Sequence, residues 1–399
     1  MTCARLLQPL AAALLLVSFV ASPARGQAAA PPAYDSFYVF GDSLADNGNV
    51  WLTSKLLISA QKITGPAPPP SESPNLTYSR GRFSNGPVAF EYLWEKLKKP
   101  GSPALVPYIS APTLGKTGAV NFAFGGTGTP VLDQTPGGLW APGLLGQVTL
   151  FKVGLKGKSP SKHALYAIVS GANDYRIGAF NEPMSPEVVV ANIGTAVQSL
   201  YKTGARDIIV LTLPNLGCLP YVPESECIAP APPTGEGAVR PSQLTFIHNA
   251  LLAQKLGELQ ATGKLPGATV RLVDVNVPFD RLRAAIGAIP PPMPLPFPLW
   301  ALPALDVLIP TGLTLPNGEP FLLPTGVQPP MSACLFVAPG LCTDVPVEVR
   351  LPDGSFMPVR LPDGSFATPF PLLFWDVVHP TTFAHSRLAD YLYGQLLQQ

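Results

Sequence analysis

Charged residues are scarce in this sequence. Asp, Glu, Lys and Arg make up 13% of its 399 residues, and the 26 basic side chains almost balance the 25 acidic ones. A soluble domain ordinarily carries about twice that charged share. This composition argues against a nucleic-acid-binding protein, an acidic tail and a charged coiled coil.

Long uncharged runs are also few, and neither of the two present reads as a membrane-spanning helix. Residues 1–26 contain Arg5, an apolar stretch interrupted by Pro9, and small residues up to Gly26, an order typical of a secretory signal peptide. The run 284–305 contains seven prolines, which a membrane-spanning helix cannot accommodate. We therefore expect a secreted or periplasmic protein with no transmembrane segment after removal of residues 1–26.

Cysteine is sparse, with five residues and no Cys-x-x-Cys pattern, so neither a zinc cluster nor a redox motif is predicted. Removal of the signal peptide would take Cys3 with it and leave four. An even number in an exported protein suggests disulfides, for which three pairings are possible. We expect the two short-range pairs, Cys218–Cys227 and Cys334–Cys342.

Proline, by contrast, is abundant. The chain has 50 of them, more than twice the average share of about 5%, which argues against an all-helical bundle. Residues 290–330 hold 13, and Asp306 and Glu319 are the only charged residues there. We expect one domain over residues 27–399, with a proline-rich apolar insertion at about 289–330 that is either a rigid packed arm or a substrate-facing lid. Pro-Asp-Gly in each copy of a repeat at 349–356 and 359–366 predicts a hairpin turn.

Five short proline-free segments are rich in β-branched or aromatic residues and predict strands. Two of them are near-continuous apolar runs, which are typical of parallel strands that are buried on both faces of the sheet. Helical patterns lie between them, notably at 188–201 and 244–259, and this alternation predicts a three-layer α/β/α sandwich with a parallel five-stranded sheet. The predicted strands are 36–40, 119–124, 164–170, 207–213 and 269–275.

A serine follows the first predicted strand, in Gly41-Asp42-Ser43-Leu44. Open α/β sheets bind ligands beyond the carboxyl ends of their strands, which is where Ser43 would lie. A helix that followed at once would also point its first N–H groups at this site. The Gly-x-Ser-x-Gly elbow is absent, because Ala45 occupies its fifth place.

A second candidate element is Asp376-Val-Val-His379 near the C-terminus. One turn of helix-like backbone would bring residues three apart together, so Asp376 could hold Nδ1–H of His379 and leave Nε2 as a base. Of the other three histidines, His163 lies in a polar stretch and His248 within a predicted helix, and both are interpreted as structural or solvated. His385 is a weaker candidate for the base.

Small residues end two further predicted strands. Gly125-Gly126-Thr127-Gly128 follows the second strand, and Gly171-Ala172-Asn173-Asp174 follows the third. At these positions a backbone N–H or a side-chain amide can approach a ligand, although either segment alone is also what an ordinary turn requires.

Together, these four blocks in this order resemble the secreted esterases and lipases of the GDSL/SGNH hydrolase family. The resemblance covers roughly residues 34–398, except the 289–330 insertion, and includes Gly81-Arg-Phe-Ser-Asn-Gly86 and Leu213-Pro-Asn-Leu-Gly-Cys218. It implies a flavodoxin-like parallel sheet and no metal or organic cofactor.

The resemblance also implies roles for individual residues. Ser43 would be the nucleophile, His379 the base and Asp376 the group that orients it. The oxyanion hole would consist of the Ser43 N–H, the Gly126 N–H and the Asn173 side-chain amide, with the choice between Gly125 and Gly126 left open.

The favoured function is a secreted serine hydrolase that cleaves small-molecule or lipid carboxylic esters through an acyl-enzyme. A phospholipase or lipid acyltransferase would use the same chemistry, and the apolar insertion would suit it and transient contact with lipid surfaces. A polysaccharide acetylesterase is disfavoured by the low polar content of that insertion, and a non-enzymatic binding module by the presence of every catalytic position. No nucleic acid partner is expected.

Overall fold

The coordinates are those of a computed structural model. It describes residues 34–281 and 374–397 with short gaps, and between them the backbone of four strands. The expected signal peptide, most of the 289–330 insertion, the second Pro-Asp-Gly repeat and the pair Cys334–Cys342 lie outside the described residues. The gaps are 73–77, 112–113, 116–117, 137, 176–182, 220–221, 223–226, 230–231, 234–238 and 377.

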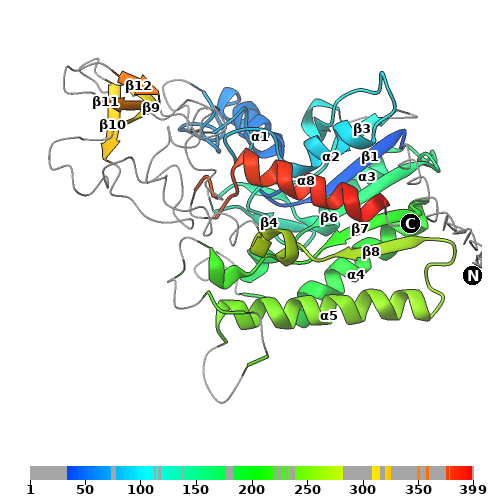
Figure 1. Ribbon diagram of the computed structural model, residues 1–399. Coiled ribbons are helices and arrows are strands. Elements are labelled where there is room, and N and C mark those ends of the chain that lie inside the picture. Colours follow the sequence, from blue (N-terminus) through cyan, green and yellow to red (C-terminus); the bar gives the residue numbers. More distant parts are fainter. Residues whose placement is uncertain are drawn as a thin grey trace, which may run out of the picture.

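A parallel sheet of six strands forms the centre of the fold (Figure 1). Its order is β2-β3-β1-β6-β7-β8, and all five neighbouring pairs are parallel. The five predicted strands are all present. The sixth, β2, has two residues, too few for a recognisable pattern, and its Pro107 is tolerated because β2 is an edge strand. The bounds are β1 Ser36–Gly41, β2 Val106–Pro107, β3 Gly118–Asn121, β6 Ala164–Val169, β7 Asp207–Leu211 and β8 Thr269–Val273.

Helices cover both faces of the sheet, which confirms the predicted three layers. Phe37 and Val39 of β1 point into a core shared with α2 and α8, whereas Tyr38 and Phe40 point into a core shared with α3, α4 and α5. This burial on both faces explains the near-continuous apolar strands. The two predicted helices, 188–201 and 244–259, are α4 and α5, each extended at both ends. The helices are α1 Asn49–Ser59, α2 Ala89–Leu97, α3 Leu144–Gly154, α4 Pro186–Thr203, α5 Pro241–Ala261 and α8 Thr382–Leu397.

The structure also contains a disulfide, 3-10 turns and three two-stranded sheets among the described residues. The disulfide Cys218–Cys227 is present and starts from a 3-10 turn, η3. β11 and β12 pair as an antiparallel hairpin around the first Pro-Asp-Gly, where the turn was predicted. Among the described residues no helix combines the length and apolarity needed to cross a membrane. The remaining elements are η1 Tyr108–Ser110, η2 Ala172–Tyr175, η3 Leu216–Cys218, β4 Leu132–Gln134, β5 Trp140–Pro142, β9 Leu308–Thr314, β10 Pro320–Pro324, β11 Glu348–Arg350 and β12 Phe356–Pro358.

His248 is a fully buried residue of α5. Its Nδ1 lies 2.7 Å from the hydroxyl of Tyr175, and within the described part of the chain its Nε2 has no hydrogen-bond partner. Desolvation lowers the pKa of His248 to about 4. The ring is therefore neutral in the folded protein at neutral pH, and protonation favours the unfolded chain.

The folded state should accordingly lose stability on acidification through His248. Its pKa in the folded chain lies below the unfolded value of about 6.5, so this contribution is present above pH 6.5 and is lost as the pH falls towards 4. Between pH 7 and pH 4.5 we expect wild type to lose about 2 kcal/mol more unfolding free energy than His248→Gln, measured by urea denaturation. The control is the exposed His163, whose Gln variant should follow wild type. Equal losses in wild type and His248→Gln would contradict the prediction.

Candidate active site

The candidate residues meet at the carboxyl ends of three neighbouring strands. Ser43 follows β1, Gly126 follows β3, and Asn173 follows β6. In the sheet, β1 lies between β3 and β6. The chain therefore first adds strands on one side of β1 and later adds strands on its other side. This is the switch point at which open parallel sheets bind ligands.

The turn that carries Ser43 is held by its neighbours. The backbone N–H groups of Ala45 and Asp46 donate to the Asp42 carbonyl at 3.1 and 2.9 Å. Asn121 Nδ2 donates to the Ala45 carbonyl at 2.6 Å, which ties the turn to the end of β3. The turn therefore presents Ser43, a residue that is 9% exposed, from a fixed backbone.

Ser43, His379 and Asp376 form a continuous hydrogen-bonded chain. Ser43 Oγ lies 2.8 Å from His379 Nε2, and His379 Nδ1 lies 2.5 Å from Asp376 Oδ2. The other carboxylate oxygen, Oδ1, accepts the N–H groups of Val378 and His379 at 2.8 and 2.7 Å. A base against a hydroxyl, with a carboxylate behind the ring, is the combination that activates a serine for nucleophilic attack.

The carboxylate of Asp376 is set up to remain ionised. Its side chain is buried, which alone would raise its pKa, but the hydrogen bond and charge of His379 and the two backbone N–H groups lower the pKa below its ordinary value. Asp376 therefore stays a hydrogen-bond acceptor for the imidazole at any pH at which the ring can act as a base.

The two adjacent glycines after β3 are not equivalent. The Gly125 N–H donates to Asp46 Oδ2 at 2.9 Å, whereas no hydrogen bond of the Gly126 N–H is found among the described residues. Gly126 has a φ of 78°, and a Cβ there would run into Pro136, so the position requires glycine. Of the two glycines, Gly126 is thus the one whose backbone N–H is not engaged by Asp46.

Asn173 lies opposite these glycines in η2. Its Nδ2 donates to the Thr127 carbonyl at 3.1 Å, which joins the loop after β6 to the loop after β3. The neighbouring Asp174 is nearly buried and accepts the N–H and the hydroxyl of Thr129 at 3.0 and 2.7 Å. Burial raises the pKa of Asp174 to about 6, against the opposing effect of these bonds. Asp174 thus joins the two loops rather than facing a ligand.

A helix does not follow Ser43 at once. Helix α1 starts only at Asn49, and Asp46 accepts the N–H groups of Gly48, Asn49 and Val50 at 2.8, 2.6 and 3.2 Å. Burial raises the pKa of Asp46 to about 6, although the backbone hydrogen bonds that its carboxylate accepts lower that pKa. The first N–H groups of the helix are therefore bound to Asp46 rather than pointed at the site.

Residues 81–86 make contacts with the segment around His379 that the sequence did not predict. The ring of Phe83 lies 5.1 Å from the His379 ring, centroid to centroid. Ser84 Oγ donates to the Pro380 carbonyl at 2.9 Å, and Asn85 Oδ1 accepts the N–H of Thr382, the first residue of α8, at 2.8 Å. This loop thus holds the segment that carries His379. Its match to a family block was the only signal available in the sequence.

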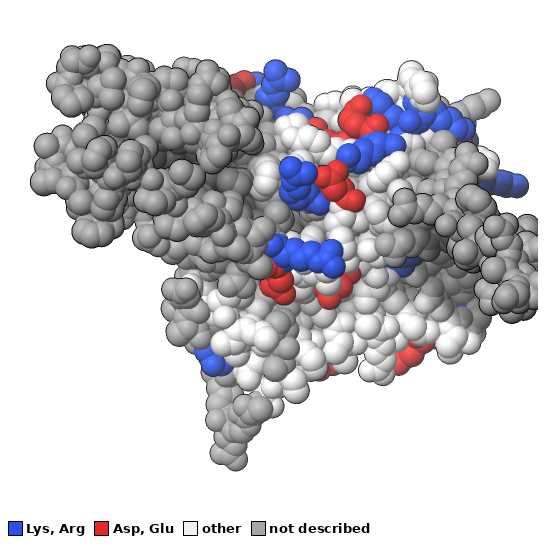
Figure 2. All heavy atoms as spheres, viewed as in Figure 1, with Lys and Arg blue, Asp and Glu red and all other residues white. Residues whose placement is uncertain are grey.

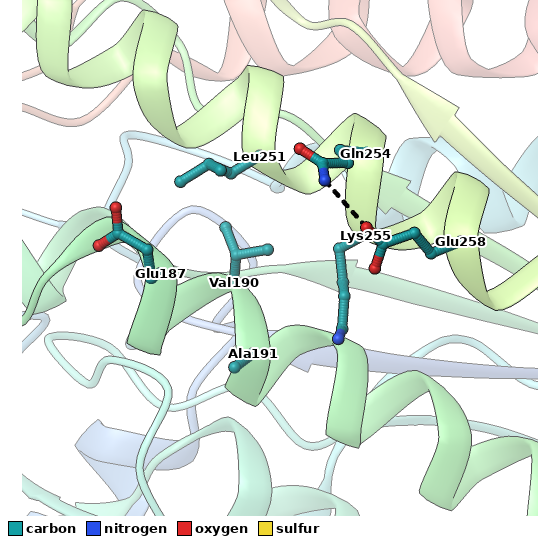
Figure 3. Close-up of a pocket in the computed structure, with 7 residues that line it drawn as sticks. All are labelled: Glu187, Val190, Ala191, Leu251, Gln254, Lys255 and Glu258. Atoms are coloured by element: carbon teal, nitrogen blue, oxygen red, sulfur yellow. Dashed lines mark hydrogen bonds between the residues drawn. The ribbon is translucent and has the colours of Figure 1, made fainter.

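A shallow hollow elsewhere on the protein lies between α4 and α5 (Figure 3). None of the residues discussed above lines it, and two of its four polar lining residues, Gln254 and Glu258, are hydrogen-bonded to each other at 2.9 Å. Among the described residues on the face shown in Figure 2, acidic and basic side chains are interspersed and form no large patch of one sign. No group of three or more His, Cys, Asp or Glu able to hold a metal ion occurs in the described part of the chain.

Comparison with known proteins gives a consistent picture. Residues 37–392 match the family described as GDSL-like lipase/acylhydrolase. A GDSL esterase/lipase of Arabidopsis thaliana is 30% identical over 275 residues, covering 63% of this chain and 73% of that protein. A second one is 29% identical over 297 residues, covering 67% and 76%. A phosphatidylcholine-sterol acyltransferase of Aeromonas hydrophila is 26% identical over 260 residues, covering 63% and 61%.

The bond from Asn85 to α8 should contribute measurably to stability. We expect Asn85→Ala to lower the unfolding free energy by about 1 kcal/mol, the usual cost of removing a side chain that caps a helix N-terminus. Urea denaturation measures the loss, and Gln254→Ala, which removes an exposed hydrogen bond on α5, should change stability by less than about 0.5 kcal/mol. An Asn85 variant as stable as the Gln254 control would contradict this interpretation.

Proposed function

Because the chain belongs to the GDSL-like lipase/acylhydrolase family and is a carboxylic ester hydrolase, we propose that it works through an acyl-enzyme on Ser43. The observation that carries the proposal is the Ser43–His379–Asp376 chain of hydrogen bonds, 2.8 and 2.5 Å long. Family membership supports the reaction type, and this geometry supports the assignment of residues.

In the first half of the reaction, Ser43 Oγ attacks the ester carbonyl carbon while its proton passes to His379 Nε2. The tetrahedral intermediate collapses when Nε2–H gives that proton to the departing alkoxide, so that an alcohol leaves and the acyl group stays on Ser43. In the second half, a water gives its proton to Nε2 and attacks the acyl carbon. The second tetrahedral intermediate collapses when the bond from the acyl carbon to Ser43 Oγ breaks and Nε2–H returns its proton to Oγ, which releases the acid and restores both Ser43 and His379. Asp376 holds Nδ1–H throughout and offsets the charge of the protonated ring.

The developing oxyanion is stabilised by donors from three strand ends. These are the N–H of Ser43, the N–H of Gly126 and the side-chain amide of Asn173. The Asp46–Gly125 bond and the Asn173–Thr127 bond hold two of them in place before the substrate arrives, so little reorganisation is needed during the reaction.

Export from the cell is part of the proposal. It is supported by the pattern of residues 1–26, which is typical of a signal peptide, and by the disulfide Cys218–Cys227, since disulfides persist in oxidising compartments.

Lipid acyl transfer is a second candidate function, favoured by the similarity to an acyltransferase that is named for phosphatidylcholine and sterol. The first half of the reaction would be the same. In the second half the hydroxyl of an acceptor alcohol would take the place of water, give its proton to His379 and receive the acyl group, so that a new ester forms.

Replacement of the nucleophile tests the main proposal. Ser43→Ala removes the only group that the acyl chain can be attached to, so turnover of p-nitrophenyl butyrate should fall by at least about 10⁴-fold. A fluorophosphonate probe should label wild type but not the variant. Retained turnover or retained labelling in a variant with wild-type circular dichroism would refute the assignment of Ser43.

The balance between hydrolysis and transfer can be read from products. Wild type is incubated with phosphatidylcholine vesicles with and without cholesterol, and free fatty acid and cholesteryl ester are quantified by chromatography. For a hydrolase we expect free fatty acid in both cases and little steryl ester. Steryl ester as the main product would make acyl transfer the function, and Ser43→Ala serves as the blank.

A further inference from the structure

A tyrosine outside the Ser43–His379–Asp376 chain makes a hydrogen bond to its carboxylate. The hydroxyl of Tyr78 donates to Asp376 Oδ2 at 2.7 Å. This is the same oxygen that lies 2.5 Å from His379 Nδ1. Since Oδ1 accepts two backbone N–H groups, Asp376 receives four hydrogen bonds, and the one from Tyr78 is the only one of them that comes from outside residues 376–379.

We propose that Tyr78 is a positioning residue for the proposed hydrolysis, which fixes the Asp376 carboxylate and limits how strongly Oδ2 attracts the protonated His379 ring. The inference rests on the proposed function. Tyr78 acts through Asp376 and has no contact with the reacting atoms in this role.

The placement of Tyr78 is well defined. Its backbone N–H donates to the Pro70 carbonyl at 2.8 Å, and the next residue, Ser79, donates to the Ser84 carbonyl at 2.9 Å. Its ring meets the rings of Phe83 and Trp375 edge-on, with centroids 6.4 Å away in each case. The hydroxyl is therefore held at Oδ2 by packing on both sides rather than by the hydrogen bond alone.

Tyr78 remains a donor over the whole working pH range. Burial, then the negative charge of Asp376 and the hydrogen bond to it, raise the pKa of Tyr78 above its ordinary value. The other titratable group near His379 is His385 of α8, whose pKa is lowered to about 3 by burial and by the charge of His379. His385 is therefore neutral above about pH 4, and Asp376, which accepts the hydrogen bond from Tyr78, is the charged partner of the His379 ring among the described residues.

Removal of the hydroxyl has a predictable sign. In Tyr78→Phe, Oδ2 loses a donor and keeps more of its negative charge for His379 Nδ1–H, which favours the protonated ring. The acidic limb of the pH profile, which reports loss of the base, then moves to higher pH. The carboxylate also loses one of its four anchors, so the ring is held less firmly and kcat falls.

The experiment compares Tyr78→Phe with wild type on p-nitrophenyl butyrate from pH 4.5 to 9. We expect kcat to fall about three- to tenfold, with a smaller change in KM, because the lost hydrogen bond is one to a charged group. The pH at which kcat/KM falls to half of its maximum on the acidic side should move up by about half a pH unit. The chain offers a matched control in Tyr34, whose hydroxyl donates to the Asp207 carboxylate, at the amino-terminal end of β7 and away from the site. Tyr34→Phe should leave kcat and the pH limb unchanged.

A second variant keeps the ring and the hydroxyl and so protects the test against misfolding. Incorporation of 3-fluorotyrosine at position 78 makes the phenol a stronger donor, and the acidic limb should move to lower pH, opposite to Tyr78→Phe. Opposite shifts in the two variants support the inference. A limb that stays in place in both, with a wild-type kcat, overturns it.

Failure of the proposed function would look different. It would appear without any Tyr78 variant, as no fluorophosphonate labelling of wild type or as ester turnover that persists in Ser43→Ala, and the inference would then fall with it.

Discussion

The geometry of the site depends on the hydrogen bonds that the carboxylate of Asp46 accepts. It is completely buried and accepts N–H groups from the start of α1 and from Gly125. Burial of a carboxylate costs several kcal/mol of folding free energy unless hydrogen bonds offset it. Asp46 therefore needs the N–H of Gly125 as well as those of its own segment, and this requirement ties the loop after β1 to the loop after β3. The same carboxylate occupies the Gly125 N–H, whereas no hydrogen bond of the adjacent Gly126 N–H is found among the described residues.

The site is assembled from two parts that are distant in sequence. Ser43, Gly126 and Asn173 are carried by the sheet, whereas Asp376 and His379 precede α8 at the other end of the chain. No strand among the residues that the structure describes joins the two parts directly. The loop over residues 78–86 does so instead, through hydrogen bonds to Asp376, Pro380 and Thr382 and through the contact of Phe83 with the His379 ring.

Much of the fold and the chemistry could be predicted because both rest on local patterns. Apolar runs marked the strands, as for 165–169, and Ser43 and the Asp376–His379 pair stood in recognisable blocks. What escaped prediction depends on contacts between distant segments. The two-residue strand β2 exists only by pairing with β3. Whether a helix follows Ser43 at once was left open, and α1 begins only at Asn49, where Asp46 accepts its first N–H groups. The docking of Asn85 on α8 joins residues almost 300 positions apart and leaves no local signature.

The way in which the loop 78–86 holds the start of α8 also bears on how such a protein can vary in length. Both ends of the connection from β8 to Phe374 are fixed independently, one by the sheet and the other by this loop and by the packing of α8 on α2. The entropy of closing a flexible connection grows only with the logarithm of its length, at about 0.6 kcal/mol for each doubling. Insertions between these two anchors therefore cost little and need not displace the histidine, so this connection is where a lineage can acquire new segments without rebuilding its chemistry.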